Sequence, residues 1–480
     1  MRRTKIVATL GPATDKPKVL GKLIAAGLDA ARLNYSHGTR EDHAKRARAV
    51  RRAAKTEGRE IALIADLQGP KIRLEKFRHG PIQLEEGDDF IIDADLASNA
   101  GDERHVGVTY KALARDVYAG DTLLVDDGRI ILKVERVDGN SIETVVLLGG
   151  TLSDNKGINR EGGGLSAKAL THKDRLDLKH AVDCGADYIA VSFPRTAKDI
   201  HDARRLLTKA GSNAGIIAKM ERAEALDHAE EIIRAADGIM IARGDLGVEI
   251  GDSRLPPVQK HLIDLARRCH RIVITATQMM ESMIESPMPT RAEVFDVANA
   301  VLDGTDAVML SAETSIGKFP LQTVEAMARI CWEAEKGWPD NQTELSLDAA
   351  FERVDQAIAV STIYCANRIQ VKAIAALTET GATTKWMSRI RTDIPIFAMS
   401  GLTETLRKVS LYRGVQPLAF DIRNIEHAEV TAGILDQLRA RGAIADGDKV
   451  IITKGDLLGD VGGTNGMKIV TAGAYVEHVA

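Results

Sequence analysis

Two acids and a lysine stand at the ends of two consecutive strand-like runs near the middle of the chain. Lys219 is the last residue of the apolar run 215–219, and Glu221 follows that run. Asp245 follows the second run, 238–242. A helical pattern separates the runs, so the strands should be parallel and their carboxyl ends should share one edge. Folds of the α/β type place their chemistry at that edge. The carboxylate pair predicts a divalent cation with oxygen ligands and the lysine predicts an anionic substrate; a salt-bridged surface loop is the alternative.

The elements that must position these residues alternate between short apolar runs and amphipathic helical patterns. The runs are rich in β-branched residues and end in polar ones, as expected for buried parallel strands. Helical patterns such as 223–236 and 291–302 fill the gaps between runs. One right-handed series of this kind predicts an α/β fold with an eightfold β/α (TIM) barrel, and an open doubly wound sheet is the alternative. The predicted strands are 5–10, 28–33, 61–65, 187–191, 215–219, 238–242, 271–276 and 306–310.

Two breaks in the alternation divide the chain into three domains. From about residue 70 the hydrophobic pattern has a period of two, with turns at Gly87-Asp88 and Asp127-Gly128, and it predicts an inserted small β-barrel lid domain. After a polar break near residue 340, a helix over 354–369 and later strands predict a C-terminal open α/β domain of about five strands. The predicted domains are 1–69 with 170–340 for the barrel, 70–169 for the lid and 346–480 for the C-terminal domain.

Composition and charge exclude several classes of protein. The chain has 480 residues, of which 44% are hydrophobic and 28% charged, and its net charge is −4. These values give no electrostatic basis for binding nucleic acid or an anionic membrane. No apolar stretch approaches the roughly 18 residues of a membrane span, no signal peptide is visible, and the four cysteines form no CxxC pair. We therefore expect a cytoplasmic protein without a zinc site or a disulfide framework.

In a β/α barrel, the residues that follow the strands all lie on one face. Here that face would bring together long cations, carboxylates and hydroxyls, a mixture that suits phosphate and a divalent metal. Phosphoryl transfer is catalysed mostly by positioning and charge neutralisation, so the face predicts that reaction class. Glu221 and Asp245 would hold Mg²⁺ or Mn²⁺ and leave coordination positions for substrate oxygens. The collected residues are Arg32, Asn34, Ser36, Asp66, Lys71, Arg73, Lys219, Glu221, Asp245, Thr277, Ser311 and Glu313.

Several long motifs carry a resemblance to a known family. They are TKIVATLGPAT, ARLNYSHG, DLQGPKIR, NKGIN, IIAKMERAEAL, ARGDLGVE and ATQMMESMIESPMPTRAEVFDVANAVLDGTDAVMLSAET. In sequence and in order these motifs resemble pyruvate kinase, and the resemblance extends through the inserted domain into the C-terminal domain. It implies transfer of a phosphoryl group between phosphoenolpyruvate and ADP, which gives pyruvate and ATP in the last step of glycolysis.

The resemblance implies a role for each residue that matches a family motif. Arg32 would contact the transferring phosphoryl group, and Lys219 would lie between that group and the enolate oxygen. Glu221 and Asp245 would ligate the divalent ion that bridges the carboxylate and phosphate of phosphoenolpyruvate. The implied catalytic residues are Lys219, Arg32, Thr277, Ser311 and Glu313, the last three as a water relay that protonates the enolate. The implied substrate-binding residues are Arg32, Lys219, Gly244, Asp245 and Thr277.

The resemblance also implies that the barrel and the lid share the nucleotide site. Lys156 would reach in from the inserted domain, so we expect the lid to swing over the barrel mouth about hinges near residues 70 and 166–170. Closure would exclude water and limit hydrolysis of the phosphoryl donor. The implied nucleotide-binding residues are Asn34, Tyr35, Ser36, His37, Arg73 and Lys156.

One position departs from most members of the family. Members that need K⁺ carry a glutamate where this chain has Lys71, although the usual ion ligands Asn34, Ser36 and Asp66 are present. A lysine ammonium supplies the same single positive charge from a covalent tether, and two cations repel strongly at one buried site. We therefore predict activity that does not require K⁺, with Lys71 in place of the ion.

The C-terminal domain contains a candidate effector loop. Residues 377–385 (LTETGATTK) indicate a strand, a hydroxyl-rich loop and a helix, a geometry that binds phosphate; an ordinary capped helix start is the alternative. The resemblance favours the type activated by AMP or a sugar monophosphate, with a glycine-rich loop over 455–466 closing the site and a homotetramer coupling it to the barrel. The implied allosteric residues are Thr378, Glu379, Thr380, Gly381, Ala382 and Thr383.

Two other functions compete with this interpretation. A magnesium-dependent lyase that acts on an enolpyruvate or a 2-oxo acid would share the carboxylate pair, but it would need neither Lys156 nor a β lid. A non-catalytic metabolite sensor would use the C-terminal loop beside an inactive barrel, and the intact set of strand-end residues argues against it. Formation of ATP separates the kinase from both alternatives.

Overall fold

The computed structural model describes residues 1–337, 351–423, 425–426, 429–455 and 462–474. Two predicted features therefore lie wholly or partly outside the described residues. They are the domain boundary between residues 340 and 346 and the glycine-rich loop over 455–466.

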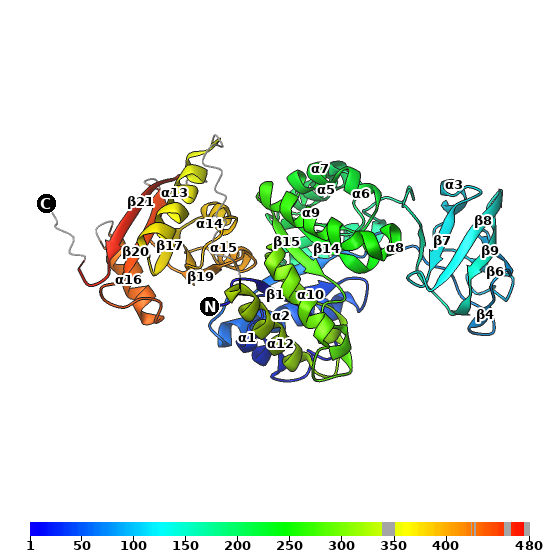
Figure 1. Cartoon of the computed structure of the whole chain (residues 1–480), viewed down its shortest axis with the longest axis horizontal. Coiled ribbons are helices and arrows are strands. Elements are labelled where there is room, and N and C mark those ends of the chain that lie inside the picture. Colours follow the sequence, from blue (N-terminus) through cyan, green and yellow to red (C-terminus); the bar gives the residue numbers. More distant parts are fainter. Residues whose placement is uncertain (338–350, 424, 427–428, 456–461, 475–480) are drawn as a thin grey trace.

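A closed barrel of parallel strands forms the centre of the molecule (Figure 1). The strand order is β1-β16-β15-β14-β13-β12-β3-β2, so β1 pairs with both β2 and β16 and closes the ring. Nearly all strand residues are buried, which explains the continuous apolar runs of the sequence. The predicted TIM barrel is confirmed, and the open doubly wound sheet is excluded. The strands are β1 (Lys5–Thr9), β2 (Ala30–Asn34), β3 (Ala62–Asp66), β12 (Tyr188–Val191), β13 (Gly215–Met220), β14 (Gly238–Ala242), β15 (Ile272–Ala276) and β16 (Ala307–Leu310).

Helices cover the outside of the barrel, and local capping signals set their ends. Thr39, Thr171 and Thr290 each begin a helix with a capping box completed by an acid. The predicted single helix 223–236 is wrong, because the backbone leaves the helical region at His228 and divides the segment into two short helices. The helices are α1 (Val19–Ala26), α2 (Arg40–Thr56), α4 (His172–Asp183), α5 (Ala197–Lys209), α6 (Glu224–Asp227), α7 (Ala229–Ala235), α8 (Arg243–Ile250), α9 (Leu255–Arg268), α10 (Arg291–Asp303), α11 (Ala312–Ser315) and α12 (Pro320–Lys336), with 3-10 turns η1 (Asp252–Arg254) and η2 (Glu281–Ile284).

The inserted segment folds around its own hydrophobic core. It forms a six-stranded sheet in the order β11-β7-β8-β9-β5-β6 and a separate pair, β10-β4. The segment 72–75 joins the two edges of the six-stranded sheet, with a bridge from Arg73 to Gly157 beside β11 and one from Leu74 to Val108 beside β6, so the sheet closes into the predicted small β-barrel. One short helix, α3 (Leu113–Asp116), interrupts the strands. The strands are β4 (Ile82–Leu84), β5 (Asp89–Asp93), β6 (His105–Gly107), β7 (Thr122–Val125), β8 (Ile130–Asp138), β9 (Ser141–Leu148), β10 (Gly150–Leu152) and β11 (Ile158–Arg160).

The C-terminal domain is an open five-stranded sheet with helices, as predicted. The order is β19-β18-β17-β20-β21, in which only β21 runs antiparallel to its neighbour. The elements are α13 (Val354–Ile369), β17 (Ala373–Leu377), α14 (Ala382–Ser388), β18 (Ile396–Ser400), α15 (Thr403–Val409), β19 (Val415–Ala419), α16 (Val430–Ala440), β20 (Lys449–Gly455) and β21 (Thr464–Thr471).

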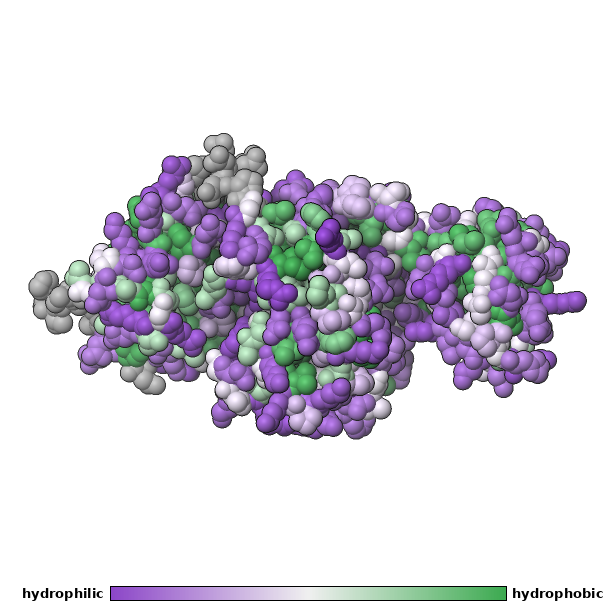
Figure 2. Space-filling view, turned by 60° about the horizontal axis from the view of Figure 1, so that its bottom comes forward, coloured by the Kyte–Doolittle hydropathy of each residue, from purple (hydrophilic) through white to green (hydrophobic). Residues whose placement is uncertain are grey.

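The three units lie in a row, with the C-terminal domain and the inserted sheets at opposite ends of the barrel (Figure 1). The C-terminal domain contacts the base of the barrel: the Tyr188 hydroxyl donates to the Lys408 carbonyl at 2.9 Å, and Lys5 Nζ donates to the Val415 carbonyl at 2.6 Å. The space-filling view shows a waist between the barrel and the inserted domain (Figure 2). None of the helices in the described ranges is long and apolar enough to cross a membrane.

Candidate active site

Lys219 lies in a buried cluster of charges at the end of β13. Its ammonium lies 3.3 Å from Asp66 Oδ1 and 2.7 Å from Glu221 Oε1, and it donates to the Ser192 hydroxyl at 2.8 Å. Arg32 joins the cluster from the end of β2, where its Nε donates to Asp66 Oδ2 at 2.7 Å. All five residues are buried. The barrel therefore holds two cations against two carboxylates at the ends of neighbouring strands.

The charge state of this cluster follows from burial and from the contacts within it. Burial disfavours the charged form of Lys219, but Asp66 and Glu221 outweigh it and raise the pKa of Lys219. Burial opposes ionisation of Asp66 as well, yet Lys219 and Arg32 lower the pKa of Asp66. Lys219 is therefore a permanent cation at neutral pH, suited to stabilising negative charge and not to accepting a proton.

Glu221 and Asp245 are the predicted metal-binding carboxylates. Glu221 Oε2 accepts the Phe193 N–H at 2.8 Å, and the buried Glu221 Oε1 faces the Lys219 ammonium at 2.7 Å. Burial raises the pKa of Glu221 despite Lys219, and the nearby Asp245 carboxylate adds to the rise. A divalent cation would relieve this repulsion, so the donor set fits Mg²⁺ or Mn²⁺. The described residues contain no group of three or more acidic, His or Cys side chains placed to bind a metal, so such an ion would need ligands from substrate and water.

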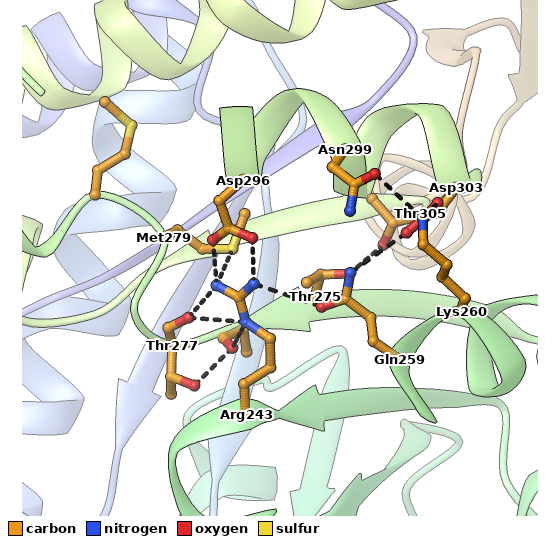
Figure 3. Close-up of polar contacts among 12 residues, drawn as sticks. Arg243, Gln259, Lys260, Thr275, Thr277, Met279, Asp296, Asn299, Asp303 and Thr305 are labelled. Atoms are coloured by element: carbon orange, nitrogen blue, oxygen red, sulfur yellow. Dashed lines mark hydrogen bonds and ion pairs between the residues drawn. The ribbon is translucent and has the colours of Figure 1, made fainter. Parts of the chain in front are cut away.

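Thr277 is held in a strained turn after β15. Its φ is 65°, in the left-handed region that a β-branched residue rarely adopts. Arg243 Nη2 donates to the Thr277 carbonyl at 2.6 Å, and its guanidinium pairs with both oxygens of Asp296 at 2.7 and 2.8 Å (Figure 3). The Thr277 hydroxyl accepts the Gly244 N–H at 2.9 Å and donates to the Ala276 carbonyl at 2.6 Å. Arg243 thus joins α8, α10 and the turn, and it places Thr277 beside the first turn of α8.

Glu313 supports the turn next to Thr277. Its carboxylate accepts the N–H of Ser311 at 2.6 Å and the N–H of Met280 at 3.3 Å, and burial raises the pKa of Glu313. The Ser311 hydroxyl is buried and has no hydrogen-bond partner within the described part of the chain. The structure brings Ser311 and Glu313 together, while no direct hydrogen bond between described residues links either side chain to the Thr277 hydroxyl.

The barrel part of the predicted nucleotide site is the turn after β2. Asn34 Oδ1 accepts the Ser36 N–H at 3.1 Å, which fixes the turn. His37 is exposed, and partial burial together with Lys71, Arg73 and Arg32 lowers the pKa of His37. Three cations thus converge on this turn, as an anionic ligand would require.

Tyr35 differs from its neighbours, because its side chain points into the protein. It is 3% exposed, its hydroxyl lies 2.9 Å from His180 Nδ1, and its ring stacks on His43. We therefore correct the expectation that its side chain belongs to the nucleotide site.

In the lid part of the predicted nucleotide site, Arg73 and Lys156 contact other residues of the inserted domain. Arg73 Nη1 donates to the Asn155 carbonyl at 2.8 Å, and Lys156 Nζ lies 2.8 Å from Asp126 Oδ1. Both cations are therefore engaged outside the barrel mouth in this conformation.

Lys71 follows Gly69 and Pro70 at the junction between barrel and insert, and it is exposed. In the described ranges, no hydrogen bond or ion pair joins its ammonium to Asn34, Ser36 or Asp66. Lys71 and Asp245 do line the same small cavity between the barrel and the lid. The role of Lys71 as a replacement for K⁺ stays a prediction.

The predicted effector loop lines a cavity of about 210 Å³ in the C-terminal domain. The hydroxyls of Thr383 and Thr464 lie 2.7 Å apart, so the first turn of α14 contacts the start of β21. Gly381 does not line the cavity; its N–H donates to the Thr378 hydroxyl at 2.9 Å and its φ is 83°, which shapes the loop. The predicted residues that do line the cavity are Thr378, Glu379, Thr380, Ala382 and Thr383.

The sequence analysis missed two side chains that orient the buried cations. Ser192, which follows β12, accepts a hydrogen bond from Lys219, and Thr9, the last residue of β1, accepts one from Arg32 Nη1 at 2.9 Å. Both lie at strand ends, which is the signal that could have identified them.

The closed barrel and the buried cations at its strand ends are typical of barrel enzymes that act on anionic substrates. Comparison with known proteins narrows the class. The family model for the barrel domain of pyruvate kinase matches residues 1–324, and the model for its alpha/beta domain matches residues 356–470. The chain is 53% identical to pyruvate kinase II of Salmonella typhimurium over 475 residues, which cover 98% of this chain and 99% of that relative.

Other relatives agree. The chain is 52% identical to a pyruvate kinase of Haemophilus influenzae, covering 95% of this chain and 96% of the relative. It is 41% identical to a pyruvate kinase of Mycobacterium intracellulare, covering 97% of each chain. The chain therefore belongs to the pyruvate kinase family. It is a glycolytic phosphotransferase that converts phosphoenolpyruvate and ADP into pyruvate and ATP.

Proposed function

We propose that the buried charge cluster around Lys219 performs this phosphoryl transfer. The observation that carries the proposal is the contact of Lys219 with Asp66, Glu221 and Ser192. Arg32 lies beside this cluster on β2, which β12 and β3 separate from β13 in the barrel. Because this cation is already in place, the protein need not rearrange when negative charge develops on the substrate.

Glu221 and Asp245 would hold Mg²⁺ or Mn²⁺ beside this cluster. When bound, the ion would neutralise charge on the carboxylate and the phosphate of phosphoenolpyruvate. Arg32 would bind the moving phosphoryl group, and its contacts with Asp66 and Thr9 orient its guanidinium before substrate arrives. Lys219 would stabilise the enolate oxygen as the bond to phosphorus breaks.

The turn at Thr277 would hold the substrate carboxylate, with the amides of Gly244 and Asp245 in the first turn of α8. Thr277, Ser311 and Glu313 would supply the proton that converts the enolate into pyruvate. The raised pKa of Glu313 and the unpartnered Ser311 hydroxyl support this assignment, and a water molecule would have to join them to Thr277.

The inserted domain would act as a lid that completes the nucleotide site. Asn34, Ser36 and His37 would contribute from the barrel, and Arg73 and Lys156 would leave their partners in the insert when the lid closes. We propose domains of 1–69 with 170–340, 70–169 and 346–480, with hinges near residue 70 and residues 166–170.

We also propose that this chain is of the type that works without K⁺ and is activated by AMP or a sugar monophosphate. Lys71 at the hinge supports the first point, and the hydroxyl-lined C-terminal cavity supports the second. In this proposal the protein would form a homotetramer and would act in the cytoplasm. Exposed apolar side chains on and before α10, Met288 and Phe295, support association with further copies.

Replacement of Lys219 tests the proposal. In Lys219→Met, the rate of pyruvate and ATP formation in a coupled assay should fall by about 10²–10³-fold or more, because a preorganised charge is lost. The affinity for phosphoenolpyruvate should change far less. Lys198→Met, at an exposed position on α5, is the matched control and should behave like the parent. A turnover number for Lys219→Met equal to that of the control would contradict the assignment.

A further inference from the structure

A cavity of about 480 Å³ lies between the base of the barrel and the C-terminal domain, apart from both sites described above. Its walls come from the amino terminus, the end of α9, the start of β16, the end of α13 and the loop after α14. This volume is typical of sites for small molecules and exceeds the needs of a single phosphate.

The lining of the cavity carries an excess of positive charge. Five arginines face two aspartates, and both aspartates already have partners. Asp306 accepts from Arg389 Nη1 at 2.7 Å, and Asp393 forms an ion pair with Arg3. Glu335, outside the lining, lies 3.7 Å from Arg3 and 3.9 Å from Arg413. The lining arginines are Arg3, Arg267, Arg389, Arg391 and Arg413.

Arg267 is the least compensated of these cations. It is half-buried at the end of α9, and its guanidinium makes no hydrogen bond or ion pair with any residue that the structure describes. It packs over Gly304, where an added Cβ would stand 2.6 Å from Arg267 Nη1. Burial, and then repulsion from Arg389 and Arg391, lowers the pKa of Arg267, and attraction to Asp306 and Asp264 offsets this only in part. A guanidinium removed from water without an acceptor is costly, and an anion in the cavity would supply one.

We propose that this cavity binds a phosphorylated small metabolite, with Arg267 and the neighbouring arginines on its phosphate. Guanidinium groups bind phosphate through paired N–H donors. Gln370 lines the cavity and can bond to the polar remainder of such a ligand, beside Asn367 and Thr392, whose side chains bond to each other at 2.8 Å. The ligand would touch both the barrel and the C-terminal domain, and it would stabilise their contact by mass action. This site is separate from the proposed effector cavity and from the barrel mouth.

Crystals of the full chain soaked in sodium tungstate, a phosphate analogue with strong anomalous scattering, locate such a site directly. We expect an anomalous peak beside Arg267 in the parent protein and in Arg268→Gln. Arg268 is the matched control, because it is the next residue of α9, is exposed and pairs with Asp264. The peak should be absent in Arg267→Gln, while peaks at the barrel mouth or the effector cavity remain.

Stabilisation by sodium pyrophosphate in solution gives the affinity. The concentration that produces half of the thermal shift attributable to this site should rise about tenfold in Arg267→Gln, because one charged contact is lost. Asn367→Asp should weaken binding in the same direction, since it keeps the shape of an exposed side chain and adds a negative charge to the lining. The Asn367→Asp variant tests the proposal by itself if Arg267→Gln does not fold. A parent crystal with tungstate at the barrel mouth but none beside Arg267 would overturn the proposal. The proposal would also be overturned if Asn367→Asp kept the tungstate occupancy and the pyrophosphate affinity of the parent. The same result in Arg267→Gln, where that variant folds, would overturn it too.

Discussion

The ammonium of Lys219 stays charged in a buried position because two carboxylates contact it and a third lies nearby. Because the cluster is buried, each carboxylate stays ionised only beside its cation. A single replacement in the cluster should therefore lower stability by more than the sum of the lost contacts suggests. At this scale the site is a set of mutually compensating charges, to which substrate and a divalent ion add their own.

Lys71 carries the prediction about monovalent cations. In tetramethylammonium buffer, the parent should turn over at the same rate with and without KCl, because the tethered ammonium replaces the ion. Lys71→Glu should lose about tenfold or more of its activity without K⁺ and should recover part of it in KCl.

Lys76→Glu is the control for this experiment, since Lys76 is an exposed lysine of the inserted domain. It should leave both activities unchanged. Strong activation of the parent by KCl would refute the role of Lys71.

Glu249 predicts a pH dependence at the junction of barrel and lid. It accepts the Ala223 N–H at 2.8 Å, and burial raises its pKa from 4.5 to about 7. The folded protein binds this proton more tightly than the unfolded chain, so stability falls as pH rises from about 4.5 to about 7. Glu249→Gln stays neutral and avoids this loss of stability, which reaches roughly 3 kcal/mol at full effect.

Thermal unfolding from pH 5 to pH 8 checks the sign. The melting temperature of Glu249→Gln should rise relative to the parent as pH increases. Glu325→Gln, at an exposed position on α12, should follow the parent at every pH. A constant difference between parent and Glu249→Gln would show that Glu249 does not titrate in this range.

At the scale of elements, α10 positions the substrate turn through one partly buried ion pair. Asp296 holds Arg243, and Arg243 holds the strained Thr277 carbonyl (Figure 3). Asp296→Asn should therefore lower kcat/KM for phosphoenolpyruvate by about tenfold or more, because a charged hydrogen bond contributes about 1.5–3 kcal/mol.

The matched control for this prediction lies on the same helix. Asp303 accepts from Lys260 and does not touch Arg243 or the turn (Figure 3). Asp303→Asn should retain nearly all activity in the same assay. Equal losses in the two variants would indicate a general effect on α10 and not a specific effect on Thr277.

At the scale of the whole molecule, the nucleotide site is divided between two units. Lys156 pairs with Asp126 inside the insert, while Asn34 and His37 belong to the barrel. Small-angle scattering should therefore show a smaller radius of gyration when Mg²⁺, ADP and oxalate are added together, as the lid closes. Unchanged dimensions under saturating ligands would count against a moving lid.

The sequence by itself determined the architecture and most of the candidate site. The helix over 354–369 was predicted with the bounds of α13, because its periodicity and ends are local properties. Arg32, Lys219, Glu221 and Asp245 were collected from strand ends, since a barrel brings all such ends to one face.

Only the tertiary structure decided which of these side chains touch one another. It turned Tyr35 inward onto His43, and it paired Arg243 with Asp296, which lies 53 residues further along the chain. It also gathered five arginines from the amino terminus, the barrel and the C-terminal domain around one cavity. Local patterns cannot specify such contacts, because they arise when the barrel closes and the C-terminal domain packs against its base.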